Sequence, residues 1–317
     1  MSTAAVELAG PASALAPDGG RRTGGTKRRP TTQLWPALGM LAPAAIGFAV
    51  FYLYPTLRGI YLSLTEYNIL GSPVFVGLQN YVDLAQDEVF WNAVRVTLLY
   101  VVLNIGFQTV LAVGLAVLMH RLTKSVLVRG SLLLPYLIAN VVVALLWYWM
   151  LDYNIGIVNA VIDAVGLPKV AFFGDEAWTI PTIAAINTWR HLGYTALLVF
   201  AGLQMIPRSV YEAAAVDGAG EWRTFWRITL PLLRPVLALV LVITVTGAFQ
   251  VFDTVAVTTS GGPGNASRVL QLYIYEQAFA RGHFGYASAM SVVLFLILAG
   301  AAFAQMRLLR AGESDLS

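Results

Sequence analysis

Apolar runs long enough to cross a lipid bilayer recur along this chain, and polar segments separate them. A hydrocarbon core of about 30 Å needs roughly 20 apolar residues in a helix. The pattern therefore predicts six transmembrane helices, with bounds near Leu34–Tyr54, Val96–Met119, Gly130–Leu151, Trp178–Met205, Pro235–Phe252 and Tyr286–Met306. An even number of crossings places both termini on the same side of the membrane.

Lysine and arginine are distributed unevenly over the segments outside these runs. The N-terminal tail, the connections after the second and fourth runs and the C-terminal end carry 14 of them, whereas the opposite side carries five. Because positive charge is retained on the cytoplasmic side, we expect both termini in the cytoplasm. The longer connections after the first and third runs are then expected to form folded surface on the outer side.

Residues 1–33 are rich in Ala, Gly, Pro, Thr and Arg and nearly lack large apolar side chains. Such a segment buries too little surface to offset its ordering entropy, so we predict a disordered basic cytoplasmic tail. The uncharged run from Pro30 to Leu57 is longer than the core of a secretory signal. This favours an uncleaved first helix at residues 34–54 rather than a cleaved signal. The paired arginines before it are interpreted as a basic cytosolic flank rather than a twin-arginine address. Residues 311–317 form a short C-terminal tail.

The overall composition agrees with a membrane protein. The chain is 58% hydrophobic and 12% charged, with a mean hydropathy of +0.69, whereas a soluble domain is about 45–50% apolar and about 25% charged. We therefore predict an all-α integral membrane protein. Cysteine is absent, which excludes disulfides, thiolate nucleophiles and Cys-ligated metals. The three histidines, His120, His191 and His283, lie far apart and show no metal-ligand spacing.

The most polar stretch between two apolar runs spans residues 206–234, and it predicts two short helices. Ser209 followed three residues later by Glu212 has the pattern of a capping box at a helix start. The alanines after it continue this helix, and the Gly-Ala-Gly sequence at 218–220 suits a turn that ends it. A second helix then follows over about 221–229.

Three large aromatic residues, Trp222, Phe225 and Trp226, share one face of this second helix. Exposed aromatic side chains surrounded by charge suit either a groove on a partner protein or the lipid surface, and the helix alone leaves both alternatives open. The acidic residues of the segment favour a protein partner, because anionic lipid repels carboxylates.

Polar side chains inside the apolar runs are costly, roughly 2.5–3.5 kcal/mol for a central Arg. They therefore mark either a lumen or a helix–helix hydrogen bond. Amide, acid and aromatic side chains are also the groups that suit sugar binding. On this basis the candidates for a translocation path are Asn140, Tyr148, Asn187, Arg190, Tyr194, Gln250 and Asp253.

Structural roles compete with that interpretation. Asn104 and Gln108 are expected mainly to tie helices together. Arg190 and Asp253 could be partners of each other or of residues in the outer loops, and His191 is expected to be structural. The small residues at 287–291 of the last run are expected to permit close helix packing.

The polar stretch resembles the cytoplasmic EAA loop of bacterial ABC-importer permeases. That pattern has Glu-Ala-Ala, three residues, a glycine and then a hydrophobic helix ending in Leu-Pro. Here it reads Glu212, Ala213, Ala214 and Gly218, followed by Phe225, Ile228, Leu230 and Pro231. YPTLRGIYLSL, FVGLQNY, GLQMIP, TSGGPGNAS and YIYEQAF also look like the carbohydrate-type group of these permeases, the maltose and glycerol-phosphate type. The resemblance covers about residues 36–310.

The resemblance implies a type I ABC importer permease fold in the bacterial cytoplasmic membrane. The transmembrane permease domain covers 34–310, with 34–54 as an additional first helix, a core transmembrane region at about 92–306 and the coupling loop at 206–234. It also implies which residues contact the ATP-hydrolysing subunit, namely Glu212, Ala213, Ala214, Asp217, Gly218, Ala219, Phe225, Leu230 and Pro231.

The resemblance further implies a set of partners. These are a second permease subunit, two ATP-binding subunits, an extracytoplasmic solute-binding protein and a small solute such as a sugar, a polyol or a glycerol phosphate. The chain has no G-x-x-x-x-G-K-[ST] phosphate loop, and none of its lysines follows a glycine. We therefore expect no cofactor on this chain and no enzymatic activity, with ATP and magnesium used by the partner subunit.

Two other classes of protein compete with this interpretation. A secondary transporter driven by an ion gradient should show acids in the middle of the membrane or broken helices, whereas here the one acid near a span is Asp253 and the runs look mostly continuous. A membrane-embedded enzyme needs paired carboxylates, a histidine pair or a nucleophile with a base, and the runs contain no such set. Both alternatives leave the EAA-like segment unexplained.

Overall fold

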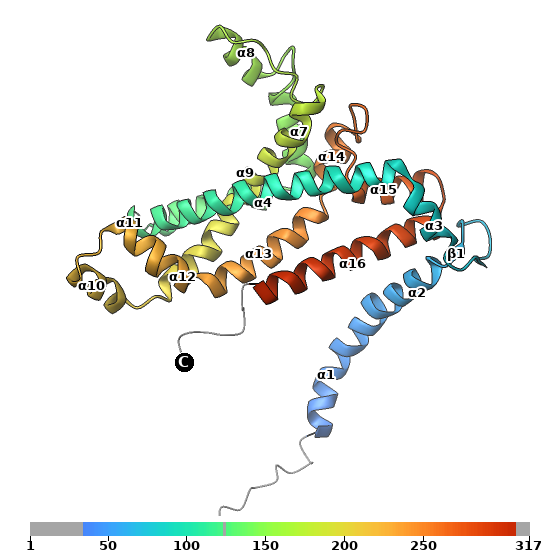
Figure 1. The fold of residues 1–317 in the computed structure, drawn as a ribbon, viewed down its shortest axis with the longest axis horizontal. Helices are drawn as coiled ribbons and strands as arrows, with labels where there is room; N and C mark the ends of the chain where they lie inside the picture. The colour runs from blue at the N-terminus through green and yellow to red at the C-terminus, as the bar shows by residue number, and fades with distance from the viewer. Residues whose placement is uncertain (1–33, 123–124, 309–317) are drawn as a thin grey trace, which may run out of the picture. The chain divides into compact units, whose positions relative to one another are not determined.

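The computed structural model describes residues 34–122 and 125–308 (Figure 1). The chain divides into two compact units, one that ends at Tyr54 and one that begins at Pro55, and each unit is considered by itself. The tails predicted over 1–33 and 311–317 lie outside the described residues.

The first unit is helical and apolar. α1 (Leu34–Phe48) continues into the π-helical turn η2 (Ala49–Leu53), and the rings of Phe48 and Tyr52 stack with their centroids 5.8 Å apart. Large apolar side chains are exposed here, and Phe51 keeps 76% of its surface accessible. Contiguous exposed apolar surface is typical of contact with lipid or with another protein, and it agrees with the predicted first span.

The second unit contains the other elements. Its helices are α2 (Tyr54–Leu62), α3 (Gln79–Gln86), α4 (Glu88–Leu122), α5 (Val126–Ser131), α6 (Leu134–Leu137), α7 (Asn140–Met150), α8 (Ile157–Ala164), α9 (Glu176–Gln204), α10 (Arg208–Val216), α11 (Glu221–Thr224), η3 (Phe225–Thr229), α12 (Leu230–Leu232), α13 (Arg234–Phe249), α14 (Asp253–Thr258), α15 (Leu270–Tyr275), η4 (Glu276–Ala280) and α16 (Phe284–Leu308). Two short antiparallel strands, β1 (Thr65–Glu66) and β2 (Val74–Phe75), place Thr65 opposite Phe75. The described chain is thus mostly helical, as predicted.

Four helical stretches of the described residues are long and apolar enough to cross a membrane. They are Gly39–Leu62, Glu88–Leu122, Arg234–Thr258 and Phe284–Arg307, and they overlap the first, second, fifth and sixth predicted spans. The fourth predicted span lies in α9, a helix of 29 residues that carries several polar side chains. The third lies partly in α7, which is apolar but only 11 residues long. The total of six crossings and the side of the termini stay predictions.

The third predicted span is broken, so the prediction of one continuous helix over Gly130–Leu151 is wrong. The run forms α5, α6 and α7, and Ile138 and Ala139 have extended backbone (ψ 139° and 136°) between α6 and α7. The run carries no charge and its apolar residues show no change of periodicity that would reveal such a break. The backbone groups released there need partners, and Arg190 supplies donors to two of them, as described below.

The fifth predicted span also ends earlier than expected. α13 stops at Phe249, residues 250–252 are not helical, and α14 begins at Asp253. The predicted end at Phe252 is therefore three residues too late. Two helix breaks thus occur within the predicted spans, one before α7 and one before α14, and α7 packs against α14.

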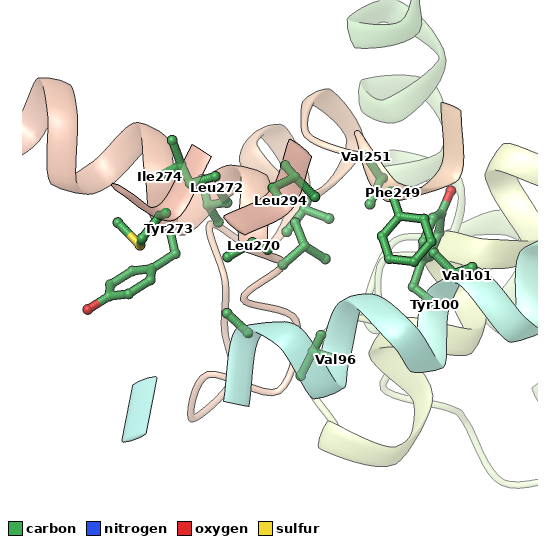
Figure 2. Close-up of a cluster of buried hydrophobic side chains, with 14 of the residues drawn as sticks. Val96, Tyr100, Val101, Phe249, Val251, Leu270, Leu272, Tyr273, Ile274 and Leu294 are labelled. Atoms are coloured by element: carbon green, nitrogen blue, oxygen red, sulfur yellow. The ribbon is translucent and has the colours of Figure 1, made fainter. Parts of the chain in front are cut away.

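The main hydrophobic core joins helices that are far apart in the sequence. α4 packs along α9 and also contacts α13 and α15. Figure 2 shows this core, in which residues of α4, of the end of α13 and the segment after it, of α15 and of α16 converge: Val96, Tyr100, Val101, Phe249, Val251, Leu270, Leu272, Tyr273, Ile274 and Leu294. The segment that contains YIYEQAF forms α15 and η4, and α15 contacts both α4 and α16.

Small residues allow the backbone of two helices to approach other segments closely. A Cβ on Gly193 of α9 would lie 1.8 Å from the carbonyl oxygen of Leu132, and one on Gly285 of α16 would lie 2.0 Å from that of Thr65. Ala287 and Ala289 of α16 are buried. The prediction that small residues of the last run are packed closely thus holds for Ala287 and Ala289, whereas Ser291 is exposed.

Candidate functional site

The EAA-like segment folds as a helix, a glycine turn and a second helix. The N–H of Gly218 donates to the carbonyl of Ala215, and the N–H of Ala219 donates to that of Ala214. This pair of bonds is a Schellman motif, which ends a helix with a residue in the left-handed conformation. Gly218 fills that position with a φ of 73°, a value that a Cβ opposes. The predicted glycine turn is confirmed.

The predicted capping box at the start of α10 is wrong. α10 begins at Arg208, Pro207 is its cap residue, and no side-chain hydrogen bond caps it. Ser209 therefore lies within the first turn instead of before it. Proline has no N–H to leave unpaired and a φ of −61°, so it starts the helix without a side-chain cap.

The residues implied in coupling are mostly accessible. Glu212, Ala213, Asp217 and Gly218 are exposed, and Ala214 is buried. The remaining members of the set, Ala219, Phe225, Leu230 and Pro231, are partly buried. One side of α10 is thus held against the protein, while the glutamate side is free for a partner.

The second helix of the segment presents its aromatic face to the surroundings. Trp222 has 76% of its surface exposed and Trp226 has 50%. Their rings meet edge to face at 5.6 Å, and Phe225 meets Trp226 in the same way at 5.4 Å. The predicted shared aromatic face is confirmed.

An ion pair and a hollow connect this segment to α4. Arg121 at the end of α4 pairs with Glu221 at the start of α11, and Thr229 Oγ1 donates to the Tyr211 hydroxyl at 3.4 Å. Between these contacts lies a hollow of about 480 Å³, lined by residues of α4, α10 and α11. The ion pair is exposed to solvent, so its own contribution to stability is small. It fixes the position of α11 more than it stabilises the fold.

A second cavity, of about 300 Å³, lies between α4, α9, α13 and the two helix breaks. Six of the seven candidates for a translocation path line it: Asn140, Asn187, Arg190, Tyr194, Gln250 and Asp253. The seventh, Tyr148, does not line it, and its ring packs against Phe173 with centroids 5.5 Å apart. Tyr148 is eight residues beyond Asn140, which places it about 12 Å further along α7 and away from the cavity. We call this space the polar cavity.

Two hydrogen bonds join the helices around the polar cavity. Asn140 Nδ2 donates to Asp253 Oδ2 at 3.0 Å, and Thr254 Oγ1 donates to Asn187 Oδ1 at 3.1 Å. The start of α14 is thereby joined to the start of α7 and to α9. Asn140 Oδ1 and Asn187 Nδ2 are buried without a hydrogen-bond partner in the described residues, which is a costly state for amide atoms.

Arg190 is not paired with Asp253, so the prediction that they could be partners is wrong. Its guanidinium donates to the carbonyl oxygens of Tyr136 at 3.2 Å and of Ile138 at 3.2 and 3.4 Å. It also bonds His191 at 3.0 Å and lies over the Tyr136 ring. Carbonyls freed by the break before α7 offer better geometry to a planar donor than a carboxylate that Asn140 already binds.

Asn104 and Gln108 tie α4 to α9, as predicted. Asn104 Nδ2 donates to the carbonyl oxygen of Ala184 at 3.3 Å and to Thr188 Oγ1 at 3.2 Å. Gln108 Nε2 donates to Thr195 Oγ1 at 2.7 Å. The ring of His191 bonds the carbonyl of Asn187 and the guanidinium of Arg190, as expected of a structural residue, and it also lines the polar cavity.

Sequence reasoning missed several residues that line the polar cavity. Tyr136 lies in the broken third span, and its ring stacks on that of Tyr194 with centroids 4.6 Å apart. Thr195 and Thr244 also line the cavity. A tyrosine just after Pro135 was a usable signal for Tyr136. The threonines gave none, since threonine is common in transmembrane helices.

A polar cluster away from the cavity was missed as well. Asp87 Oδ2 accepts hydrogen bonds from the hydroxyls of Tyr273 at 2.6 Å and Tyr286 at 2.7 Å. Its Oδ1 accepts from the N–H groups of Val89 and Phe90 at the start of α4. One carboxylate thus joins the starts of α4 and α16 to α15.

The fold is that of a helical membrane protein with apolar spans and an exposed EAA-like segment. Residues 108–311 match the family of binding-protein-dependent transport system inner membrane components, and the chain belongs to that family. The match begins later than the core region predicted from residue 92, and it includes the EAA-like segment and most residues of the polar cavity.

Individual relatives agree with this assignment. The chain is 34% identical over 274 residues to the sulfoquinovosyl glycerol transport system permease protein SmoG of Agrobacterium fabrum, covering 86% of this chain and 89% of the relative. It is similar to a crystal structure of a bacterial ABC transporter involved in the import of the acidic polysaccharide alginate, with 26% identity, a TM-score of 0.78 and coverage of 88% and 96% of the two chains.

The chain is also similar to an alginate ABC transporter that was solved with a periplasmic protein bound. A crystal structure of a bacterial alginate ABC transporter in complex with an alginate pentasaccharide-bound periplasmic protein is 27% identical, with a TM-score of 0.76 over 89% of this chain and 98% of the solved one. Broken spans in the present chain therefore do not point to an ion-driven transporter, because the fold as a whole is that of an ABC-transporter chain.

Proposed function

We propose that this chain is a permease subunit of an ATP-driven, binding-protein-dependent importer that moves a sugar or a related small polar solute into the cytoplasm. The observation that carries the proposal is the pairing of the two sites in one chain. The Glu212–Gly218 segment presents an exposed helix and turn to a partner, and the polar cavity offers amide, acid and aromatic groups to a solute.

The coupling segment is the contact with an ATP-hydrolysing partner. Its exposed glutamate, its rigid Schellman turn and its aromatic face suit insertion into a groove of a soluble protein. Closure of that partner on ATP would move α10 and α11, and α11 carries the motion to α4 through Glu221 and Arg121. ATP and magnesium belong to the partner in this scheme, and this chain binds no cofactor.

The polar cavity is the place where the solute crosses. Alternating access requires two packings of the spans with comparable free energy. The hydrogen bond between Asn140 and Asp253, which joins the two helix breaks, closes the cavity in one packing. The unpaired amide atoms of Asn140 and Asn187 favour a second packing in which they gain partners. Six spans with both termini in the cytoplasm place the coupling segment on the side of the ATPase.

Assembly with other subunits follows from this role. The importer needs a second permease subunit, two ATP-binding subunits and an extracytoplasmic solute-binding protein. The similar alginate transporter that was solved in complex with a periplasmic protein supports this set of partners. The segments that contain α3 and α8 are the docking surface proposed for the binding protein.

The test is solute-stimulated ATP hydrolysis by the purified complex with native chain or with Gly218→Pro. Proline cannot adopt the φ of 73° at that position, so we expect the complex to assemble and stimulation to be lost. Gly220→Ser is the matched control, because Gly220 has a φ of −66° and caps α11, a position that serine favours. Unchanged stimulation in Gly218→Pro, or no association of the native chain with an ATPase, would refute the proposal.

A further inference from the structure

We infer that an apolar stripe along α8 packs permanently against the second permease subunit. The stripe comprises Ile157, Val161 and Val165, and it continues into Ile155 and Leu167 on either side of the helix. This inference rests on the proposed function, which requires the second subunit. It also narrows the docking surface proposed for the solute-binding protein to the polar side of α8 and the segment that contains α3.

The apolar side of α8 faces outward. Ile157, Val161 and Val165 follow one another at intervals of four residues, so they share one face of the helix, and they keep 62%, 59% and 67% of their surface exposed. Asn159, on the opposite face, is buried. Figure 1 shows α8 at one end of the second unit, beyond α7. An exposed apolar stripe of this kind marks a surface that another molecule covers.

Hydrogen bonds of Asn159 fix the direction in which the stripe points. Its Nδ2 donates to the carbonyl oxygens of Asp152 at 3.1 Å and Val170 at 3.0 Å, and its Oδ1 accepts from the N–H of Val170 at 2.9 Å. Gly156 lets α8 begin close to the end of α7, because a Cβ there would lie 2.4 Å from the carbonyl oxygen of Asp152. α8 cannot turn the stripe inward without breaking these contacts, so the stripe is preorganised for a partner.

The charges near the stripe favour a protein over lipid as its cover. Helices that lie in a lipid surface carry Lys or Arg on their polar face, whereas the one charged residue of α8 is Asp163. From residue 152 to residue 176 the connection contains four acidic residues and one lysine. Anionic lipid repels carboxylates, so the side of α8 next to the stripe is unsuited to a lipid surface.

The apolar character of the stripe favours a permanent partner over a transient one. In the proposed function the solute-binding protein leaves to collect solute, so the surface that docks it meets water between visits. Transient interfaces are about as apolar as the rest of a protein surface, whereas obligate interfaces are more hydrophobic. The stripe has five exposed apolar residues and no charged one, which matches the obligate class. In the proposed importer, the permanent partner that shares the outer side of the membrane is the second permease.

Photochemical crosslinking in the complete importer identifies the partner. Val161 is replaced by the photoreactive amino acid p-benzoylphenylalanine, which reacts with neighbouring C–H groups on illumination. We expect an adduct between this chain and the second permease, formed before the binding protein is added. Asp163 is exposed on another side of the same helix and is the matched control position, from which we expect no adduct with the second permease.

The native chain has no cysteine, which permits an independent measurement once the cysteines of the partner subunits are replaced. Val161→Cys and Asp163→Cys are treated with a membrane-impermeant maleimide in the complex without the binding protein, and each rate is divided by that of the denatured chain. We expect Val161→Cys to react about tenfold slower than Asp163→Cys, because the core of an obligate interface excludes water. Asp163→Cys should react like Ser72→Cys, on the exposed connection between β1 and β2.

An adduct of the Val161 probe with the binding protein, or with lipid only, would overturn the inference. So would equal reaction of Val161→Cys and Asp163→Cys before the binding protein is added. A complex that contains the second permease and hydrolyses ATP, yet gives no adduct between α8 and that subunit, would refute this inference and leave the proposed function intact. A native chain that associates with no second permease would refute the proposed function itself.

Discussion

Asn140 Nδ2 donates a 3.0 Å hydrogen bond to Asp253 Oδ2 and thereby joins the two helices that follow the breaks in the third and fifth predicted spans. The two residues are 113 positions apart in the chain. Asn140 is the first residue of α7, and Asp253 is the first residue of α14. The bond therefore connects two short helices at the ends that adjoin the two breaks.

We predict that Asn140→Leu destabilises the chain and impairs transport. The substitution removes the hydrogen bond and leaves a partly buried carboxylate without its donor, which costs about 1–3 kcal/mol. Thermal unfolding of the purified protein in lipid nanodiscs measures the loss. Val141→Leu, at an adjacent and exposed position, should leave stability unchanged, and equal stability of the two variants would contradict the role given to the bond.

We predict that Arg190→Met loosens the break in the third span. The carbonyls of Tyr136 and Ile138 lose their donor, and each unsatisfied group costs about 1–3 kcal/mol if it stays buried. Hydrogen–deuterium exchange should become faster over residues 136–143. Arg190→Lys should restore protection only in part, because an ammonium cannot make the planar, forked contact.

The control for this experiment is Arg58→Met, which removes an exposed arginine that contacts only the Tyr61 ring in the described chain. Exchange over 136–143 should then match the native protein. If Arg190→Met also left exchange in that segment unchanged, the carbonyl contacts of Arg190 would not hold the break.

We predict a loss of stability at acid pH that depends on Asp87. Burial tends to raise the pKa of this carboxyl, but its hydrogen bonds from Tyr273, Tyr286 and the N–H groups of Phe90 and Val89 together hold the pKa below its usual value of 3.8. A carboxyl with a lowered pKa in the folded state contributes stability above its unfolded pKa. That contribution is lost as the pH falls below about 3.9 and through the folded value.

The Tyr273 hydroxyl, which donates a hydrogen bond to Asp87, stays protonated through this pH range. Burial, together with the Asp87 carboxylate, raises the pKa of Tyr273 to about 12, so it donates at every pH of interest. Asp87→Asn should therefore be less stable than the native chain at pH 7 and should lose less stability between pH 5 and pH 3. Unfolding measured across that range checks the prediction, with the exposed Asp83→Asn as the control that should follow the native curve.

Apolar runs in the sequence were sufficient to predict the long helices. α4 and α16 contain the second and sixth predicted spans, because a bilayer-length apolar run has few alternatives to a helix. Gly218 was also predictable, since a glycine after an alanine-rich helix has a defined role in ending it. These features depend on local chemistry that the sequence carries directly.

Features that depend on contacts between distant segments could not be predicted in the same way. The break before α7 lies in a run without charged residues, and the arginine that binds its carbonyls, Arg190, is 52 positions away from Ile138. Asp253 was considered as an ion-pair partner of Arg190 because opposite charges attract. Nothing in the sequence distinguished Asn140, the residue that binds Asp253 in the structure, from the other polar residues of the spans. The structure shows that main-chain carbonyls compete successfully for the guanidinium.

The same limit applies to the polar cavity. Asn187, Arg190 and Tyr194 line the cavity together, because their spacing places them on one face of α9. Tyr148 was grouped with Asn140 by residue type alone, and the chain turns it towards Phe173 instead. Residue type indicated a polar path, and only the packing shows which side chains share it.

The most direct test of the central claim is solute uptake by proteoliposomes that contain the purified chain with its partner subunits and binding protein. The account predicts uptake that requires hydrolysable ATP on the side of the coupling segment, requires the binding protein and is lost in the Gly218→Pro variant. Uptake by this chain alone, driven by an ion gradient and independent of ATP, would contradict the account and establish an ion-driven transporter in its place.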